Sequence, residues 1–132
     1  MTPAGLLDTS VFIAAESGRE LALDRLPEQS FVCVVTVAEL EAGVLAATTT
    51  EVRARRLRTA QRAGAITPLP IDAPAAAEWA RLRVVLHEQE RRVGVNDLWI
   101  ASVAVSRGLP VVTQDDDFDV LAELGLLEVV KV

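Results

Sequence analysis

The stretch Leu98 to Thr113, LWIASVAVSRGLPVVT, joins two elements that together decide the fold. Its first part is apolar on almost every helical face and stops at Gly108, which predicts a deeply buried helix. Its second part, residues 109–113, reads as a strand without polar alternation, as expected for a strand covered on both sides. A buried helix followed by a doubly covered strand is typical of a parallel sheet with helices on both faces.

The rest of the chain repeats this alternation. We expect strands at residues 4–8, 30–35, 65–71, 109–113 and 126–132. We expect helices from about residue 11, and at residues 36–47, 51–63, 72–93, 98–107 and 118–124. The sequence therefore predicts one α/β domain over residues 1–132, with a mostly parallel sheet of about five strands between two helical layers.

Charge and cysteine content narrow the functional classes. The formal net charge of −6 argues against bulk attraction to nucleic acid or to an anionic membrane. No apolar stretch approaches the roughly 18 residues that span a bilayer. Cys33 is the single cysteine, so an internal disulfide is impossible, and we expect a cytoplasmic protein.

Five carboxylates stand where strands end or helices begin. They are Asp8, Glu39, Asp97, Asp115 and Asp117. Each could instead satisfy a helix start. Thr9 and Ser10, which follow Asp8, could cap the helix that begins near residue 11. Thr36 and Glu39 have capping-box spacing, and either Asn96 or Asp97 could cap the next helix. The acidic run of residues 115–119 could serve the first turn of the last helix.

The alternative is a metal site, because functional groups collect beyond the carboxyl ends of parallel strands. Carboxylates brought close together repel one another and take up protons unless a cation neutralises them. Oxygen ligands without His or Cys favour Mg²⁺ or Mn²⁺ over zinc.

Four motifs occur in order along the chain: LLDTSVFIA, TVAELEAGV, VNDLWIASVA and VVTQDDDF. In order and approximate spacing they resemble the PIN-domain ribonucleases, and the length of 132 residues resembles the VapC toxins of bacterial toxin–antitoxin pairs. The resemblance covers nearly the whole chain. It implies a PIN-like three-layer α/β/α fold and an Mg²⁺- or Mn²⁺-dependent endoribonuclease. It also implies the toxin of a type II pair, a homodimer held inactive by a cognate VapB-like antitoxin.

The resemblance also implies residue roles. The catalytic and metal-binding acids would be Asp8, Glu39, Asp97 and Asp115, with Asp117 as a further metal ligand. Supporting positions would be Thr9, Ser10, Asn96 and Thr113. Asp116 and Asp119 match no family role and are interpreted as solvated or capping residues.

A basic helix offers a possible RNA contact. Arg55, Arg58 and Arg62 share one helical face, which could track phosphates beside the acids. The same face could also be plain solvated surface, with Arg55 paired to Glu51.

Two other functions compete with the nuclease. One is a non-catalytic α/β interaction domain in which all the acids are caps. The other is a haloacid-dehalogenase-like phosphotransferase, which needs a second aspartate two residues after Asp8, where this chain has Ser10. Within the nuclease hypothesis, the choice among transfer, ribosomal and messenger RNA stays open, as does the number of metal ions.

Overall fold

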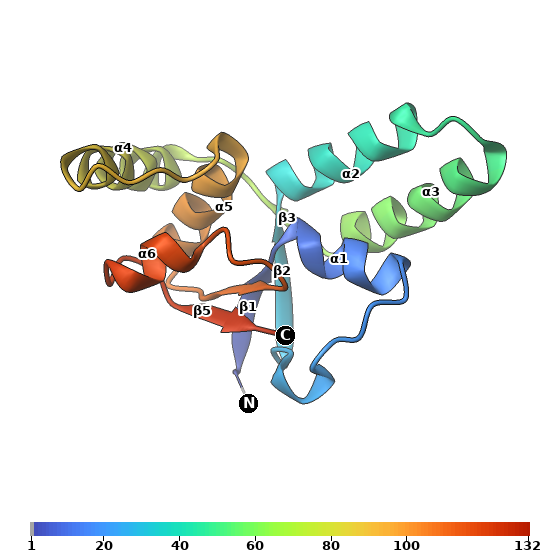
Figure 1. Ribbon diagram of the computed structural model, residues 1–132, viewed down its shortest axis with the longest axis horizontal. Coiled ribbons are helices and arrows are strands. Elements are labelled where there is room, and N and C mark those ends of the chain that lie inside the picture. Colours follow the sequence, from blue (N-terminus) through green and yellow to red (C-terminus); the bar gives the residue numbers. More distant parts are fainter. Residues whose placement is uncertain (1) are drawn as a thin grey trace.

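A five-stranded parallel sheet forms the centre of the molecule (Figure 1), in a computed structural model that describes residues 2–132. The strands are β1 (Ala4–Leu7), β2 (Gln29–Cys33), β3 (Pro68–Leu69), β4 (Val111–Thr113) and β5 (Val129–Lys131). Their spatial order is β3-β2-β1-β4-β5, and every pairing is parallel. The predicted parallel sheet of about five strands is confirmed.

Six α-helices of residues 2–132 cover the sheet. They are α1 (Thr9–Glu16), α2 (Val34–Ala46), α3 (Thr50–Ala65), α4 (Ala73–Glu88), α5 (Val95–Ser106) and α6 (Asp119–Glu123), with a short 3₁₀ turn, η1 (Leu23–Arg25), after α1. In Figure 1, α4, α5 and α6 lie on one side of the sheet and α1, α2 and α3 on the other, with α2 and α3 forming an antiparallel hairpin. Within residues 2–132, no helix combines the length and apolarity needed to cross a membrane.

The core divides at the sheet, because successive side chains of a strand point to opposite faces. Leu6 and Val111 belong to the larger apolar cluster, which includes the buried residues of α4, α5 and α6. Leu7 and Val112 belong to the smaller cluster on the α1 face. Ile100 of α5 is fully buried, as the all-round apolar pattern of this helix predicts.

The register of the two central strands sets the position of the first acid. Leu7 of β1 pairs with Val112 of β4, and the Asp8 N–H donates to the Val112 carbonyl at 2.9 Å. Asp8 therefore leaves the sheet beside Thr113. Gly5 makes this close pairing possible, because a Cβ there would lie 2.7 Å from Val112 Cγ2.

Several helix boundaries differ from the sequence predictions, and one is the start of α5, which lies at Val95 instead of Leu98. Helix α1 begins at Thr9, with Asp8 rather than Thr9 or Ser10 as its N-cap. Helix α3 continues through Gly64 to Ala65. Helix α4 ends at Glu88, five residues early, and the chain turns through Glu90 with a φ of 54°.

Helix α2 begins at Val34, two residues earlier than predicted, and this changes the role of Glu39. The Sγ of Cys33 accepts the Val35 N–H at 3.5 Å, so cysteine, not threonine, caps the helix. The predicted capping box of Thr36 and Glu39 is wrong, because both residues lie inside the helix. The Glu39 carboxylate is therefore available to another partner.

Candidate functional site

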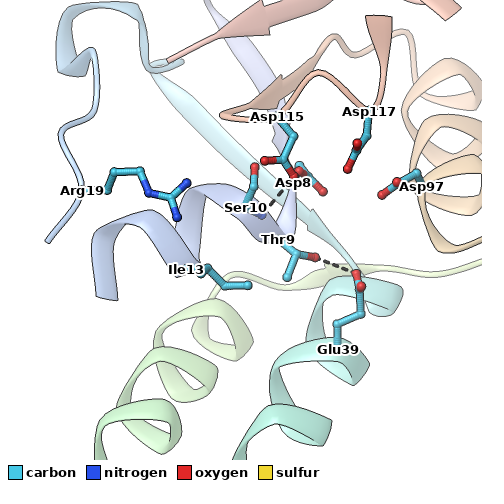
Figure 2. Close-up of a pocket in the computed structure, with 9 residues that line it drawn as sticks. All are labelled: Asp8, Thr9, Ser10, Ile13, Arg19, Glu39, Asp97, Asp115 and Asp117. Atoms are coloured by element: carbon cyan, nitrogen blue, oxygen red, sulfur yellow. Dashed lines mark hydrogen bonds between the residues drawn. The ribbon is translucent and has the colours of Figure 1, made fainter. Parts of the chain in front are cut away.

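All five candidate acids line one cavity of about 280 Å³ at the carboxyl edge of β1 and β4 (Figure 2). Its lining consists of Asp8, Thr9, Ser10, Ile13, Arg19, Glu39, Asp97, Asp115 and Asp117. The acids come from four separate segments: the end of β1, helix α2, the first turn of α5 and the turn after β4. Residues that are distant in sequence thus meet where a parallel sheet gathers functional groups.

Asp8 is a capping residue and a cavity residue at once. Its side chain is almost completely buried, and Oδ2 accepts a hydrogen bond from Thr113 Oγ1 at 2.9 Å. The same oxygen lies 3.4 Å from the Ser10 backbone nitrogen, which is the N-cap contact of α1. The capping and metal-site interpretations of Asp8 are therefore compatible.

A hydroxyl network fixes the turn that carries Asp115. Thr113 Oγ1 accepts the Asp115 N–H at 3.0 Å and lies 3.1 Å from Ser10 Oγ. Ser10 Oγ in turn accepts the Gln114 N–H at 3.0 Å. Because Thr113 is fully buried, these contacts tie the turn after β4 to the start of α1 without competition from water.

Glu39 is oriented by a second hydroxyl pair. Thr9 Oγ1 donates to Glu39 Oε1 at 2.8 Å and also lies 3.0 Å from the buried Thr36 Oγ1. A hydroxyl-to-carboxylate bond is stronger than one between neutral groups. Thr9 therefore links the first turn of α1 to the acid contributed by α2.

Asp97 has the most perturbed environment of the acids. Gly94 is the N-cap of α5 and no side chain caps this helix, so neither Asn96 nor Asp97 is the cap that the sequence suggested. The pKa of Asp97 is raised to about 7. Burial is the largest cause, and the negative charges of the neighbouring acids contribute the rest, in the order Asp8, Asp117, Glu39 and Asp115. Burial, followed by Asp8 and Asp117, also raises the pKa of Asp115. The site therefore carries more negative charge than its surroundings stabilise.

The cavity offers carboxylate oxygens as metal ligands, and its lining includes no His or Cys among residues 2–132. Such a set of ligands suits a hard divalent cation. Within residues 2–132, no three His, Cys, Asp or Glu side chains are already gathered closely enough to hold an ion as they stand. The carboxylates line the cavity from several sides instead (Figure 2). Those that would hold an ion are Asp8, Glu39, Asp97, Asp115 and Asp117.

Some predicted residues lie away from the cavity. Asn96 is exposed and does not line it, so its supporting role stays a prediction. Arg55, Arg58 and Arg62 are exposed on α3, and none of them lines the cavity. Arg55 pairs with Glu16 at 3.7 Å, so the expected pairing with Glu51 is wrong.

The remaining two aspartates of the acidic run have a different partner. The Lys131 ammonium lies 2.5 Å from Asp116 and 2.9 Å from Asp119, so both face β5 rather than the cavity. Phe118 is the N-cap of α6 and no side chain caps that helix either. The acidic run is thus divided between the cavity and a surface ion pair.

Two residues that line the cavity, Ile13 and Arg19, were not predicted from the sequence. Ile13 is an apolar residue of α1 whose side chain is 45% exposed at the cavity. Arg19 follows the glycine that ends α1, in a polar stretch without a recognisable motif. Its position at the cavity depends on how the chain turns at the end of α1. No sequence pattern predicted that position.

Comparisons with known proteins agree with this geometry. The sequence model of the PIN domain matches residues 5–124. Ribonuclease VapC5 of Mycobacterium tuberculosis is 55% identical over 99% of this chain and 98% of its own length, and Ribonuclease VapC4 of the same organism is 41% identical over 94% and 95%. A crystal structure of VapBC-5, a toxin–antitoxin system from Mycobacterium tuberculosis, matches with a TM-score of 0.91 at 52% identity, covering 98% of this chain and 99% of the matched chain.

The fold and the acidic cavity define an α/β protein built around a parallel sheet with carboxylates at its carboxyl edge. With a family model matching most of the chain and relatives above 40% identity over nearly its full length, the chain belongs to the PIN-domain family.

Proposed function

We propose that this chain is a divalent-metal-dependent endoribonuclease that acts as the toxin of a type II toxin–antitoxin pair. Relatives at 55% and 41% identity are named ribonucleases, and a structure at 52% identity belongs to a toxin–antitoxin system. The observation that carries the proposal is the convergence of five carboxylates from four segments on one cavity. PIN-domain nucleases generally depend on a divalent metal, and we assign Mg²⁺ or Mn²⁺ here because the donors are hard oxygens.

In this mechanism the carboxylates position the reactants. Asp8, Asp97 and Asp115 would be the principal metal ligands, with Glu39 and Asp117 at the margins of the site. A bound divalent ion supplies a water of lowered pKa and neutralises charge on the phosphoryl oxygens. No side-chain nucleophile is needed for phosphodiester hydrolysis of this kind.

The hydrogen-bonded residues keep two carboxylates in fixed directions. Thr113 donates to Asp8, so this acid presents its remaining lone pairs toward the cavity. Thr9 holds Glu39 in the same way. Glu39 would accept a proton from the attacking water, directly or through a second water, because its carboxylate lies at the cavity without being a helix cap.

Asp97 would act as the charge-sensitive ligand. With a pKa of about 7, its carboxyl is about half protonated at neutral pH when no cation is near. A divalent cation held by Asp97 would favour the ionised form of its carboxyl, because a positive neighbour lowers the pKa of an acid.

The alternative of a non-catalytic interaction domain requires all the acids to be caps. Asp8 satisfies this requirement, but Glu39 lies inside α2 and neither Asp97 nor Asp117 caps a helix. A haloacid-dehalogenase-like phosphotransferase is excluded by the family to which the chain belongs.

A VapB-type antitoxin is the partner that the structural relatives favour, since the 52%-identical match is a chain of a VapBC toxin–antitoxin system. An apolar groove between α2 and α3, flanked by Leu45 and Leu57, offers surface for such a partner. Leu45 is 82% exposed and Leu57 is 45% exposed, so the two side chains present apolar surface together at this groove. A homodimer, an RNA substrate and a cytoplasmic location stay predictions.

The test is metal-dependent cleavage of RNA by the purified chain. Total RNA incubated with the protein and millimolar Mg²⁺ or Mn²⁺ should yield discrete new 5′ ends, and sequencing of these ends would identify the target RNA. Excess chelator should abolish the products, and Asp97→Asn, which preserves side-chain size, should remove them at unchanged helical content. Cleavage that persists in chelator, or equally in Asp97→Asn, would contradict the proposal.

A further inference from the structure

Arg19 is the one cation among the residues that line the acidic cavity, as far as residues 2–132 are concerned. Figure 2 shows its guanidinium directed toward Ser10 and Asp115, while Asp97 and Asp117 lie on the opposite side of the cavity. A single arginine facing five carboxylates requires an explanation, because metal ligation alone gains nothing from a nearby positive charge.

The backbone beside Arg19 is held in place from two directions. Gly18 adopts a φ of 73°, and the Arg19 N–H donates to the Ala14 carbonyl at 2.9 Å, which closes the end of α1. The Gln114 side-chain amide donates to the Glu20 carbonyl at 3.2 Å and also to the Val132 carbonyl. Because Gln114 precedes Asp115, the segment carrying Arg19 is tied to the turn that carries a cavity acid.

The guanidinium of Arg19 is not engaged elsewhere in the described chain. Within residues 2–132, the ion pairs closer than 4.0 Å use other cations, namely Arg55, Arg81, Arg91, Arg107 and Lys131. The positive charge of Arg19 lowers the pKa of Asp115, although burial, Asp8 and Asp117 outweigh it and leave that pKa raised. Arg19 thus acts on the cavity electrostatically without closing onto a carboxylate.

Three of the five arginines of α3 use their side chains in contacts with the protein itself. Arg55 pairs with Glu16, Arg53 donates to the Ala47 carbonyl at 2.8 Å, and Arg56 donates to the Gly43 carbonyl at 2.8 Å. These contacts hold the α2–α3 hairpin and α1 together. Within residues 2–132, the Arg19 side chain makes no such contact, and unlike Arg58 and Arg62 it lines the cavity.

We infer that Arg19 is a substrate-binding residue that holds an RNA phosphate at the α1 side of the cavity. This inference rests on the proposed function and adds a specific phosphate contact to it. A guanidinium binds phosphate through two parallel hydrogen bonds, and an acidic chain with a net charge of −6 needs a local cation to retain a polyanion beside its carboxylates. The phosphate would lie between Arg19 and the carboxylates that would hold the metal.

The experiment measures RNA binding separately from cleavage. A fluorescent single-stranded RNA is titrated with the chain carrying Asp97→Asn, which prevents cleavage, and then with Arg19→Gln, Arg19→Lys or Arg25→Gln added. Arg25 is the matched control, because it is an exposed arginine of the same connecting segment that does not line the cavity. Anisotropy is recorded over a range of salt concentrations.

The expected results separate the variants. Arg19→Gln weakens RNA binding on the order of 10- to 100-fold, as expected for one charge-assisted contact. It also lowers the slope of log affinity against log salt by about 0.7, the value for one phosphate contact on a single strand. Arg19→Lys retains the slope but recovers only part of the affinity, and Arg25→Gln matches the parent.

Three outcomes would overturn the inference. In the first, Arg19→Gln binds RNA as tightly as Arg25→Gln, and the wild-type chain still cleaves RNA. The inference then fails, while the proposed function stands. Another is a smaller thermal stabilisation of Arg19→Gln by Mg²⁺ than of wild type, which would make Arg19 a support of the metal site. If the wild-type chain neither binds nor cleaves RNA, the proposed function fails together with the inference.

Discussion

The two sides of the acidic cavity are built differently. On the β1–β4 side, Asp8 is buried and accepts a hydrogen bond from Thr113, which itself joins Ser10 and the Asp115 N–H. On the α5 side, the carboxylates of Asp97 and Asp117 accept no hydrogen bond from any group in residues 2–132, and the pKa of Asp97 rises to about 7. One side is preorganised by the protein, and the other depends on charge brought from outside.

This difference indicates that the two sides of the cavity have different roles. The β1–β4 side, called the bonded side below, keeps its geometry without a ligand, because buried hydroxyls and backbone N–H groups determine the direction of Asp8. On the α5 side, called the open side below, the carboxylates of Asp97 and Asp117 repel each other. Either a proton or a divalent cation can reduce this repulsion. Metal binding should therefore involve carboxylates of both sides, whereas pH should act mainly through Asp97 and alignment of the site mainly through Asp8 and Thr113.

The largest expected effect comes from removing the charge of Asp8. Asp8→Asn should reduce single-turnover RNA cleavage by at least about 100-fold, because a metal ligand supports several kcal/mol of transition-state stabilisation. Asparagine caps helices as well as aspartate and still accepts a hydrogen bond from Thr113, so the fold should persist. Asp117→Asn, at the exposed end of the open side, should cost less. Equal losses in the two variants would remove the distinction between the sides.

A smaller loss should follow from breaking the hydroxyl network. Thr113→Val keeps the shape of a fully buried side chain but removes the donor to Asp8 and the acceptor of the Asp115 N–H. Loss of such an orienting contact typically costs 10- to 100-fold in metal affinity or activity, and we expect about that range in kcat. Thr113→Ser restores the hydroxyl and should restore most of the activity. If valine and serine behave alike, Thr113 is only a packing residue.

The open side predicts a pH dependence of stability. Asp97 has a pKa of about 7 in the folded chain against an ordinary value of 3.8, so between these values the folded state binds more protons than the unfolded state. The metal-free protein should therefore lose stability as pH rises through about 7. Asp97→Asn should melt at a higher temperature than wild type at pH 8 and show a flatter pH profile. Asp24→Asn, on the exposed η1 turn, is the control and should match wild type.

The smallest effect should come from the arginine face of α3. Replacing Arg55, Arg58 and Arg62 together with glutamine should weaken RNA binding by about two- to tenfold, since exposed charge contacts are individually weak. The salt dependence of binding should also flatten. The triple variant Arg25→Gln, Arg81→Gln, Arg92→Gln removes the same number of positive charges from exposed positions outside α3 and is the control. Unchanged RNA affinity in the triple variant of α3 would exclude this face from the binding surface.

The sheet was predictable from the sequence because apolar strands alternate with helices, and parallel register then brings their carboxyl ends to one edge. The convergence of Asp8 and Asp115 followed from that topology. The direction of Glu39 was not predictable, because a cysteine caps α2 two residues early and the capping-box spacing is coincidental. The cavity position of Arg19 was missed for a similar reason: it depends on the glycine that ends α1 and on a hydrogen bond from Gln114, a residue nearly one hundred positions later.

The most direct test of the account is a thermal melt at pH 8 with and without Mg²⁺ or Mn²⁺. A cation at ten times its Kd should stabilise the wild-type chain by about 1.4 kcal/mol, and so raise Tm by a few degrees. The double variant Asp8→Asn, Asp97→Asn should gain nothing from either ion. Identical wild-type melts with and without metal, or an equal gain in the double variant, would contradict the claim that these carboxylates form a divalent-metal site.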